Sequence, residues 1–127
     1  MPAAKKKSST SNYRDILYEV KDQVAWITIN RPRIMNAFRE QTLDEMIDAV
    51  KSTREDPSIV CIVFTGAGDK SFSAGGDFYA MRRLTFQNAY MWNDRMLGLA
   101  MAMRDQPISD FPLCNKSFNL SYCGHDL

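Results

Sequence analysis

The pattern of apolar and polar positions predicts a β-hairpin near the start of the chain. Residues 16–20 and 24–29 are rich in β-branched and aromatic side chains, and a short polar stretch at 21–23 separates them. Pro32 ends the second strand, because proline has no N–H for a ladder and holds Arg31 in extended geometry. Two antiparallel strands joined by a turn are therefore expected.

Helical spacing replaces this pattern further along. The apolar stripe of the first helix consists of Leu43, Met46, Ile47 and Val50. Thr42 and Glu45 form a capping-box pair, so the helix is predicted to begin at Thr42, and Pro57 should stop it near Arg54 or Glu55. The partly apolar residues 34–39 before it either pack under the helix or line a ligand cleft.

Residues 59–64 are unbroken apolar sequence, which is typical of a strand covered on both faces. The order hairpin, helix, buried strand indicates an α/β layer with a right-handed crossover. A short helix is expected over 78–84 and a long one over 86–104. The face of the long helix predicted to enter the core carries Phe86, Tyr90, Leu97 and Met101, widened by Met96, Ala100 and Met103.

The chain divides into three parts on this pattern. Residues 1–12 are polar and rich in lysine and serine, which predicts a disordered leader, whereas 13–106 contain all the periodic elements. Residues 107–127 lose the periodicity, and an irregular tail is expected there.

Composition excludes several classes of function. With 45% hydrophobic and 24% charged residues and a net charge of +1, the chain has no basic field for nucleic acid. No apolar run approaches the roughly 20 residues of a membrane helix. Three cysteines form no disulfide framework and suit a reducing compartment, so a cytoplasmic location is expected. Cys114, Cys123 and His125 match no usual zinc spacing, and no metal is expected.

Two adjacent glycines, Gly75 and Gly76, follow the buried strand and precede a helix. Free peptide N–H groups in such a place can hold an oxygen that develops negative charge, although a plain glycine-rich turn gives the same pattern. A phosphate-binding loop does not fit, because Asp69 stands before Lys70, and a dinucleotide fingerprint would need glycine at Ser71.

Four motifs in order carry a family resemblance. They are Val24-Ala25-Trp26-Ile27-Thr28-Ile29-Asn30-Arg31-Pro32, Asn36-Ala37-Phe38, Ile62-Val63-Phe64-Thr65-Gly66-Ala67-Gly68-Asp69-Lys70-Ser71-Phe72 and Ser73-Ala74-Gly75-Gly76-Asp77. From about Tyr13 to about Gln106 the chain resembles the N-terminal part of the enoyl-CoA hydratase/isomerase (crotonase) superfamily. The resemblance implies an incomplete crotonase-like ββα spiral, with a hairpin and a buried strand packed with two main helices.

The resemblance also implies an activity. Such proteins bind an acyl-CoA thioester and stabilise an enolate with two peptide N–H groups, without a cofactor beyond the coenzyme A of the substrate. Gly76 is the implied first donor. The implied flanking residues of the thioester and coenzyme A are Met35, Ala37, Ala74, Gly75, Asp77 and Phe78. Arg31 or Arg33 would replace a phosphate contact that some members make with an arginine where Met35 stands.

The chain departs from the family pattern after Pro107. The second glycine-rich turn and the later catalytic carboxylates of the family have no counterpart, which suggests a truncated or frame-shifted product. Two alternatives stay open. One is a non-catalytic fragment that binds acyl-CoA, forms a homo-oligomer or associates with full-length relatives. The other is a cyclic acyl-CoA synthase or hydrolase of the same superfamily.

Overall fold

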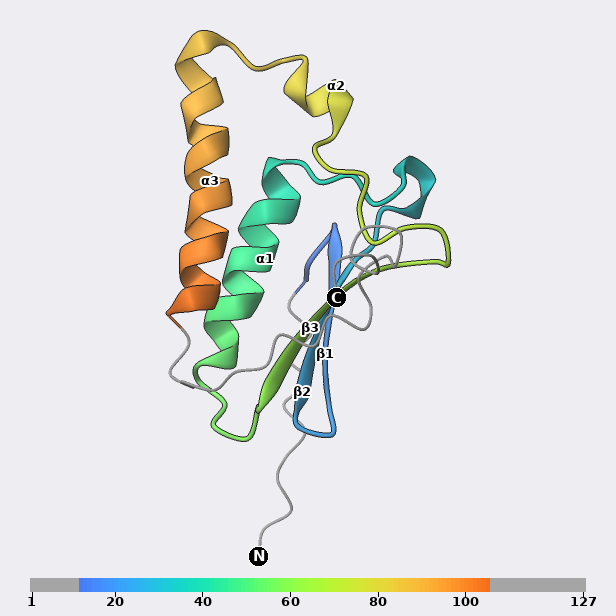
Figure 1. The fold of residues 1–127 in the computed structure, drawn as a ribbon, viewed down its shortest axis with the longest axis vertical. Coiled ribbons are helices and arrows are strands. Elements are labelled where there is room, and N and C mark those ends of the chain that lie inside the picture. Colours follow the sequence, from blue (N-terminus) through green and yellow to red (C-terminus); the bar gives the residue numbers. More distant parts are fainter. Residues whose placement is uncertain (1–11, 106–127) are drawn as a thin grey trace, which may run out of the picture.

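The computed structural model describes residues 12–105 (Figure 1). Along the chain the elements are β1 (Ile16–Lys21), β2 (Val24–Ile29), the 3₁₀ turn η1 (Pro32–Ile34), α1 (Glu40–Thr53), β3 (Cys61–Gly66), α2 (Phe78–Met81) and α3 (Phe86–Arg104). The predicted irregular tail, the three candidate zinc ligands and all but the last residue of the predicted leader lie outside the described residues.

The three strands form one sheet in the order β1-β2-β3. β1 and β2 are antiparallel, with Ile16 opposite Ile29, and the turn between them has positive φ at Asp22 and Gln23, as two-residue hairpins favour. β2 and β3 are parallel, with Val24 opposite Cys61, so α1 is the crossover between them. The predicted hairpin and α/β layer are confirmed.

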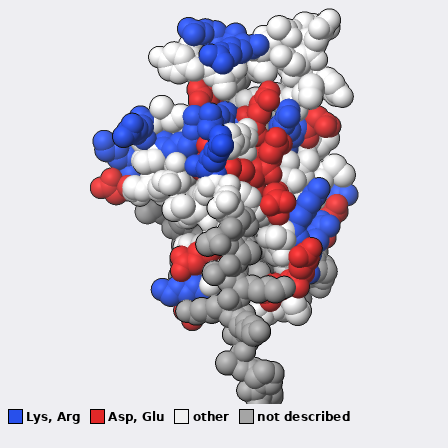
Figure 2. Space-filling model, turned by 180° about the vertical axis from the view of Figure 1, so that it is seen from behind, with Lys and Arg blue, Asp and Glu red and all other residues white. Residues whose placement is uncertain are grey.

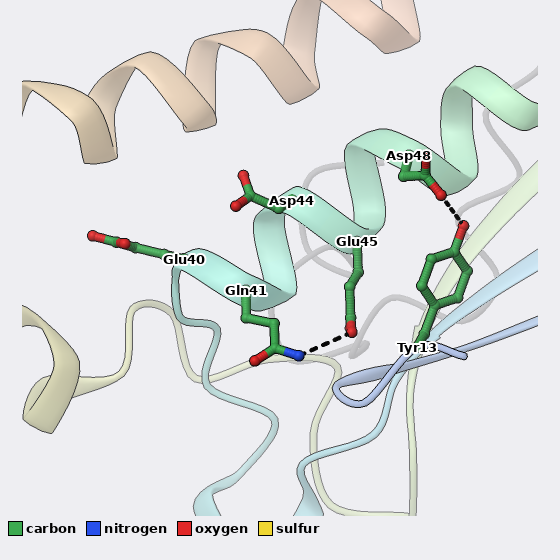
Figure 3. A pocket seen from close by; sticks show the side chains of 6 residues that line it. All are labelled: Tyr13, Glu40, Gln41, Asp44, Glu45 and Asp48. Carbon is green, nitrogen blue, oxygen red and sulfur yellow. Dashed lines mark hydrogen bonds between the residues drawn. The ribbon is translucent and has the colours of Figure 1, made fainter. Parts of the chain in front are cut away.

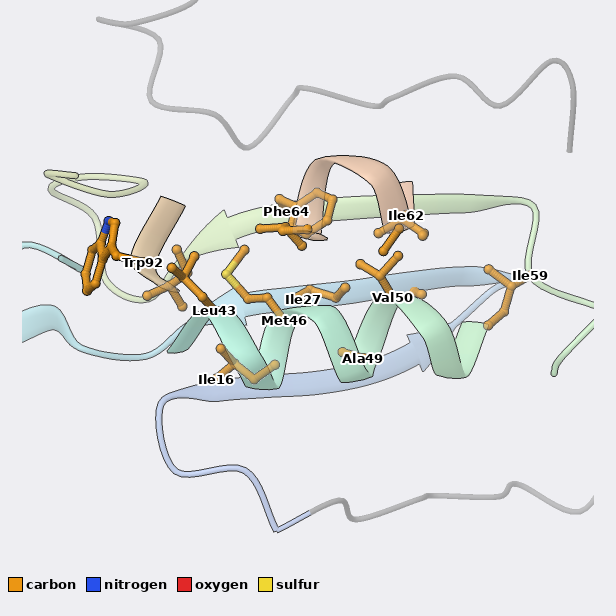
Figure 4. Packing of buried hydrophobic residues seen from close by; sticks show 14 residues of the cluster. Ile16, Ile27, Leu43, Met46, Ala49, Val50, Ile59, Ile62, Phe64 and Trp92 are labelled. Carbon is orange, nitrogen blue, oxygen red and sulfur yellow. The ribbon is translucent and has the colours of Figure 1, made fainter. Parts of the chain in front are cut away.

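The core lies between the sheet and α1, with α3 running beside α1 (Figures 1 and 4). β2 contributes alternate residues, among them Ile27, while β3 contributes Ile62 and Phe64. The buried residues of α1 that complete the cluster are Leu43, Met46, Ala49 and Val50. Each of these faces follows the period of its element, and the sequence pattern had indicated Leu43, Met46 and Val50 of α1.

The two element starts predicted at 42 and 59 are wrong. α1 begins at Glu40 with Arg39 as its N-cap, because the Thr42 hydroxyl accepts the Arg39 N–H at 3.1 Å from the third helical position. Glu45 does not cap the helix. Its carboxylate accepts the backbone N–H groups of Arg14 and Asp15, which directly precede β1. β3 begins at Cys61 rather than 59, and Ile59, although buried, donates its N–H to a turn carbonyl of Asp56.

α3 has the predicted bounds but not the predicted buried face. Its buried residues are Trp92, Leu99 and Ala102, and of the predicted stripe only Met103 packs against the core. The other predicted members, Phe86, Tyr90, Met96, Leu97, Ala100 and Met101, are exposed, Phe86 to 99%. Apolar residues occur around most of this helix, so its periodicity does not single out one face.

Candidate functional site

The two-glycine turn is held against the segment before α1. Phe38 forms an isolated parallel bridge with Gly76, in which the Phe38 N–H donates to Gly75 O at 2.9 Å and the Asp77 N–H donates to Phe38 O at 2.7 Å. Gly75 has a φ of +103°, a conformation that side chains disfavour. The turn is therefore fixed on both sides of Gly76 by one residue, Phe38.

The Gly76 N–H stands out among the amides of this turn. Ala74 N donates to Met35 O at 2.9 Å, Gly75 N to Ser73 Oγ at 3.1 Å and Asp77 N to Phe38 O. No acceptor for Gly76 N lies among residues 12–105. A trans peptide points its C=O and N–H in opposite directions, so the Gly75 carbonyl bonded to Phe38 directs the Gly76 N–H away from Phe38.

Apolar side chains lie against the α-carbon of Gly76. A methyl group added there would meet Met81 Sδ at 2.5 Å and Trp92 Cζ2 at 3.3 Å. Trp92 is buried and its ring stacks with Phe38 at a centroid distance of 6.0 Å. Gly76, which is half-buried, therefore has a thioether and the Trp92 ring beside its α-carbon, and a larger residue at this position would displace Met81.

Asp77 has a structural task next to the free amide. Its Oδ1 accepts the N–H groups of Tyr79 and Ala80 and so caps α2, while its Oδ2 accepts Arg31 Nη1 at 3.0 Å. Burial raises the pKa of Asp77, but the hydrogen bonds from Arg31, Ala80 and Tyr79 together hold that pKa below its usual value. The carboxylate is thus charged and engaged within the fold.

The predicted coenzyme A residues fall into two segments that the structure brings together. Met35 O accepts both the Ala74 N–H and the Ser71 hydroxyl, which joins the segment of Met35 and Ala37 to the glycine turn. Met35, Ala74 and Phe78 are exposed, whereas Ala37 is buried. Of residues 34–39, Ile34 and Met35 face solvent, so this segment packs only in part.

The two arginines proposed for a phosphate contact differ in environment. Arg31 Nη1 donates to Ala37 O at 2.8 Å as well as to Asp77, and the side chain is largely buried. Arg33 is exposed in η1. An external phosphate would have to displace these contacts of Arg31, which leaves Arg33 as the more accessible cation.

Asn36 organises the site, and sequence reasoning did not single it out. It is 1% exposed, and its Oδ1 accepts the Arg31 N–H while its Nδ2 donates to the carbonyls of Ala67 and Ser71. Its φ is +55°, a conformation that asparagine tolerates better than most residues. A polar residue inside an apolar stretch was the available signal.

Residues of the described part line two hollows that Gly76 does not border. One of about 460 Å³ is lined by Tyr13 and by residues along α1, where Tyr13 donates to Asp48 at 2.6 Å and Gln41 to Glu45 at 3.3 Å (Figure 3). The other, of about 170 Å³, borders the site and is lined by Pro32, Asn36, Ala67, Gly68, Asp69, Lys70 and Ser71.

Charges of both signs are interspersed on the face seen in Figure 2. Among residues 12–105, no three potential metal-ligating side chains gather, and none of the helices there is long and apolar enough to cross a membrane.

Comparisons with known proteins find similar sequences and folds. A crotonyl-CoA hydratase of Syntrophomonas wolfei is 42% identical over 77 residues, which cover 61% of this chain and 30% of that protein. The solved carnitinyl-CoA hydratase of Mycobacterium avium is 40% identical with a TM-score of 0.52, covering 54% of this chain and 26% of its own. Pseudomonas aeruginosa DspI is 29% identical with a TM-score of 0.71, covering 80% and 38% respectively.

The chain thus spans less than two fifths of the length of each of these relatives. The family model for enoyl-CoA hydratase/isomerase matches residues 19–109, which include the second half of β1 and every later strand and helix described above. The chain therefore belongs to the enoyl-CoA hydratase/isomerase (crotonase) superfamily.

Proposed function

We propose that this chain binds an acyl-CoA thioester and that the Gly76 N–H donates a hydrogen bond to the thioester carbonyl oxygen. The observation that carries the proposal is the Gly76 amide, which has no acceptor in the described structure although the amides of Ala74, Gly75 and Asp77 all have one. A donor that is fixed in advance and unpaired suits an oxygen whose negative charge grows during reaction.

The chemistry that follows is stabilisation of an enolate. A hydrogen bond to the carbonyl oxygen makes the neighbouring carbon more acidic and stabilises the anion formed there, and one such donor typically contributes about 10²–10³ in rate. Met81 and Trp92 beside Gly76 would contact the apolar part of the acyl group. Met35, Ala37, Ala74, Gly75, Asp77 and Phe78 are the proposed contacts of the thioester and coenzyme A.

The names of the relatives support the class of substrate. Two of the compared proteins are named as hydratases of crotonyl-CoA and carnitinyl-CoA, and both names specify a coenzyme A thioester. We therefore choose crotonyl-CoA as the probe.

An amide-resolved titration tests the proposal. In nitrogen-15 NMR spectra of the full chain, adding crotonyl-CoA should move the Gly76 N–H resonance downfield, whereas free coenzyme A, which has no thioester carbonyl, should move it less. The amide of Ala49 is the control, because Ala49 is buried within α1 and is none of the proposed contacts. A Gly76 resonance that ignores saturating crotonyl-CoA would overturn the assignment.

Replacement of the donor gives a second test. Gly76→Pro removes the N–H itself, and crotonyl-CoA should then bind at least about tenfold more weakly, the loss of a hydrogen bond to a charged or strongly polarised oxygen. Circular dichroism must show that the variant retains the fold. Unchanged binding by a folded Gly76→Pro chain would contradict the proposal.

A non-catalytic role is the second candidate, and the exposed face of α3 favours it. Phe86, Tyr90, Leu97 and Met101 present apolar surface to solvent, as surfaces that meet another protein do. This chain would then bind acyl-CoA without turnover, or associate with other members of its family. Hydration of crotonyl-CoA by the purified chain would exclude the purely non-catalytic role, and sedimentation would measure association.

A further inference from the structure

We propose that Arg31 is a positioning residue that fixes the direction of the Gly76 N–H. The inference rests on the proposed function for its consequence in binding, but its structural part can be measured without ligand. It starts from a single nitrogen, Arg31 Nη1, which donates to Ala37 O at 2.8 Å and to Asp77 Oδ2 at 3.0 Å.

These two acceptors lie on opposite sides of the bridge that directs Gly76. Ala37 precedes Phe38 in one segment, and Asp77 follows Gly76 in the other. The guanidinium therefore ties together the two segments that the bridge joins by the bonds Phe38 N to Gly75 O and Asp77 N to Phe38 O. Gly75 and Gly76 have no side chains that could hold the turn, so the Arg31 side chain contributes a contact to each segment.

Arg31 is itself held in place. Its backbone N–H donates to Asn36 Oδ1 at 2.9 Å, and its Nε lies 4.0 Å from the buried carboxylate of Asp15. The side chains of Arg31 and Asp77 are only 16% and 11% exposed, so solvent screens their pairing weakly. The contact is thus stronger than an ion pair on an open surface.

The consequence for Gly76 follows from the planarity of the peptide. The plane that carries the Gly76 N–H also carries Gly75 O, and among residues 12–105 the bond from Phe38 N to Gly75 O is what fixes the rotation of that plane. Without Arg31 the bridge would open more often, and the N–H would sample other directions. A misdirected donor weakens stabilisation of a developing oxyanion even when the fold is intact.

The ligand-free arm of the experiment compares amide hydrogen exchange in four chains: wild type, Arg31→Met, Arg31→Lys and Arg33→Met. In Arg31→Met, the amides of Phe38 and Asp77 should exchange about tenfold faster, as expected for the loss of a hydrogen bond to a charged group. Arg31→Lys should restore part of the protection. Arg33→Met is the matched control, because Arg33 is exposed in the same segment, and should behave as wild type. Unchanged exchange in Arg31→Met would overturn the inference.

The ligand arm follows the Gly76 resonance during titration with crotonyl-CoA. At saturation, its downfield shift should be smaller in Arg31→Met than in wild type and partly restored in Arg31→Lys. An equal shift in Arg31→Met, with only a loss of global stability, would show a merely structural role. No shift in wild type would contradict the proposed function, while the exchange arm still decides whether Arg31 fixes the bridge. If Arg31→Met does not fold, Asp77→Asn provides the same test from the other partner, because asparagine still caps helices.

Discussion

Arg39 and Asp15 are joined by two hydrogen bonds of 2.7 Å, one from Nε to Oδ2 and one from Nη2 to Oδ1. The Thr42 hydroxyl donates to the same carboxylate at 2.7 Å. The side chain of Asp15 is 4% exposed, whereas that of Arg39 is 41% exposed. The pair connects the start of β1 with the start of α1, and its two members differ sharply in their access to water.

We predict that the two members of this pair respond unequally to substitution. Arg39→Met leaves a buried carboxylate without its main partner, and it should lower the free energy of unfolding by about 3–5 kcal/mol. Asp15→Asn leaves Arg39 free to be hydrated, and it should cost about 1–3 kcal/mol. Urea unfolding followed by circular dichroism measures both. Arg33→Met is the surface control, with a change within about 0.5 kcal/mol. If Asp15→Asn lowered the free energy of unfolding as much as Arg39→Met or more, the result would contradict the argument from burial.

Stability should also fall in acid. Burial raises the pKa of Asp15, but the hydrogen bonds from Arg39 and Thr42 outweigh it and hold that pKa below the ordinary 3.8. Since the folded pKa is the lower one, the stabilisation is complete above about pH 5 and is lost as the pH falls through the folded pKa, because the unfolded chain binds the proton first. Asp77 acts in the same direction.

Urea titrations between about pH 2 and pH 7 measure this dependence. In Asp15→Asn, the free energy of unfolding should fall less steeply below about pH 4, because one of the carboxyls with a lowered pKa is gone. A profile parallel to that of wild type would show that Asp15 does not contribute to the acid sensitivity.

The sequence predicted those parts of the fold in which local pattern and burial agree. The β-branched and aromatic residues of 24–29 and the apolar stripe of α1 are strong local signals, so their elements follow directly. The start of α1 could not be predicted, because Thr42 fits both the first and the second half of a capping box. In the structure the Thr42 hydroxyl accepts the Arg39 N–H and donates to Asp15, 27 residues earlier. These contacts place Thr42 at the third helical position and not at the N-cap.

The sequence indicated the backbone donor of the candidate site but not the side chains that hold the donor in place. Two glycines after a buried strand indicated an amide donor, and the structure leaves the Gly76 N–H without an acceptor among residues 12–105. The side chains that hold this turn, Asn36 and Arg31, act across the fold on Ala67, Ser71 and Asp77. Such long-range hydrogen bonds leave no periodic trace in a sequence.

The two faces of α3 should differ in mutational cost. Leu99 is 8% exposed in the core and Leu97 is 58% exposed, although sequence periodicity assigned Leu97 to the core. Leu99→Ala should lower the free energy of unfolding by about 2–5 kcal/mol, whereas Leu97→Ala should change it by less than about 0.5 kcal/mol. Thermal or urea unfolding of the two variants decides the matter. A large loss in Leu97→Ala at low protein concentration would contradict the observed orientation of the helix.

Two glycines should respond with opposite signs to the same substitution. A methyl group at Gly66 would collide with the carbonyl oxygens of Ser71 and Phe72 and lie 2.7 Å from Asn36 Nδ2, and backbone atoms cannot move aside cheaply. Gly66→Ala should therefore lower the free energy of unfolding by about 1–3 kcal/mol or more.

Gly98 lies inside α3, where an added methyl group would meet Ile47 Cδ1 at an ordinary 3.6 Å. Gly98→Ala should raise the free energy of unfolding by about 0.5–1 kcal/mol, because alanine loses less backbone entropy in a helix. Each variant is the other's control in urea unfolding. Since Gly66 approaches the loop that Asn36 holds, Gly66→Ala should also shift the Asn36 side-chain amide resonances, and Gly98→Ala should leave them in place. Equal effects of the two substitutions would mean that the close approach of residues 71–72 to Gly66 does not exist in solution.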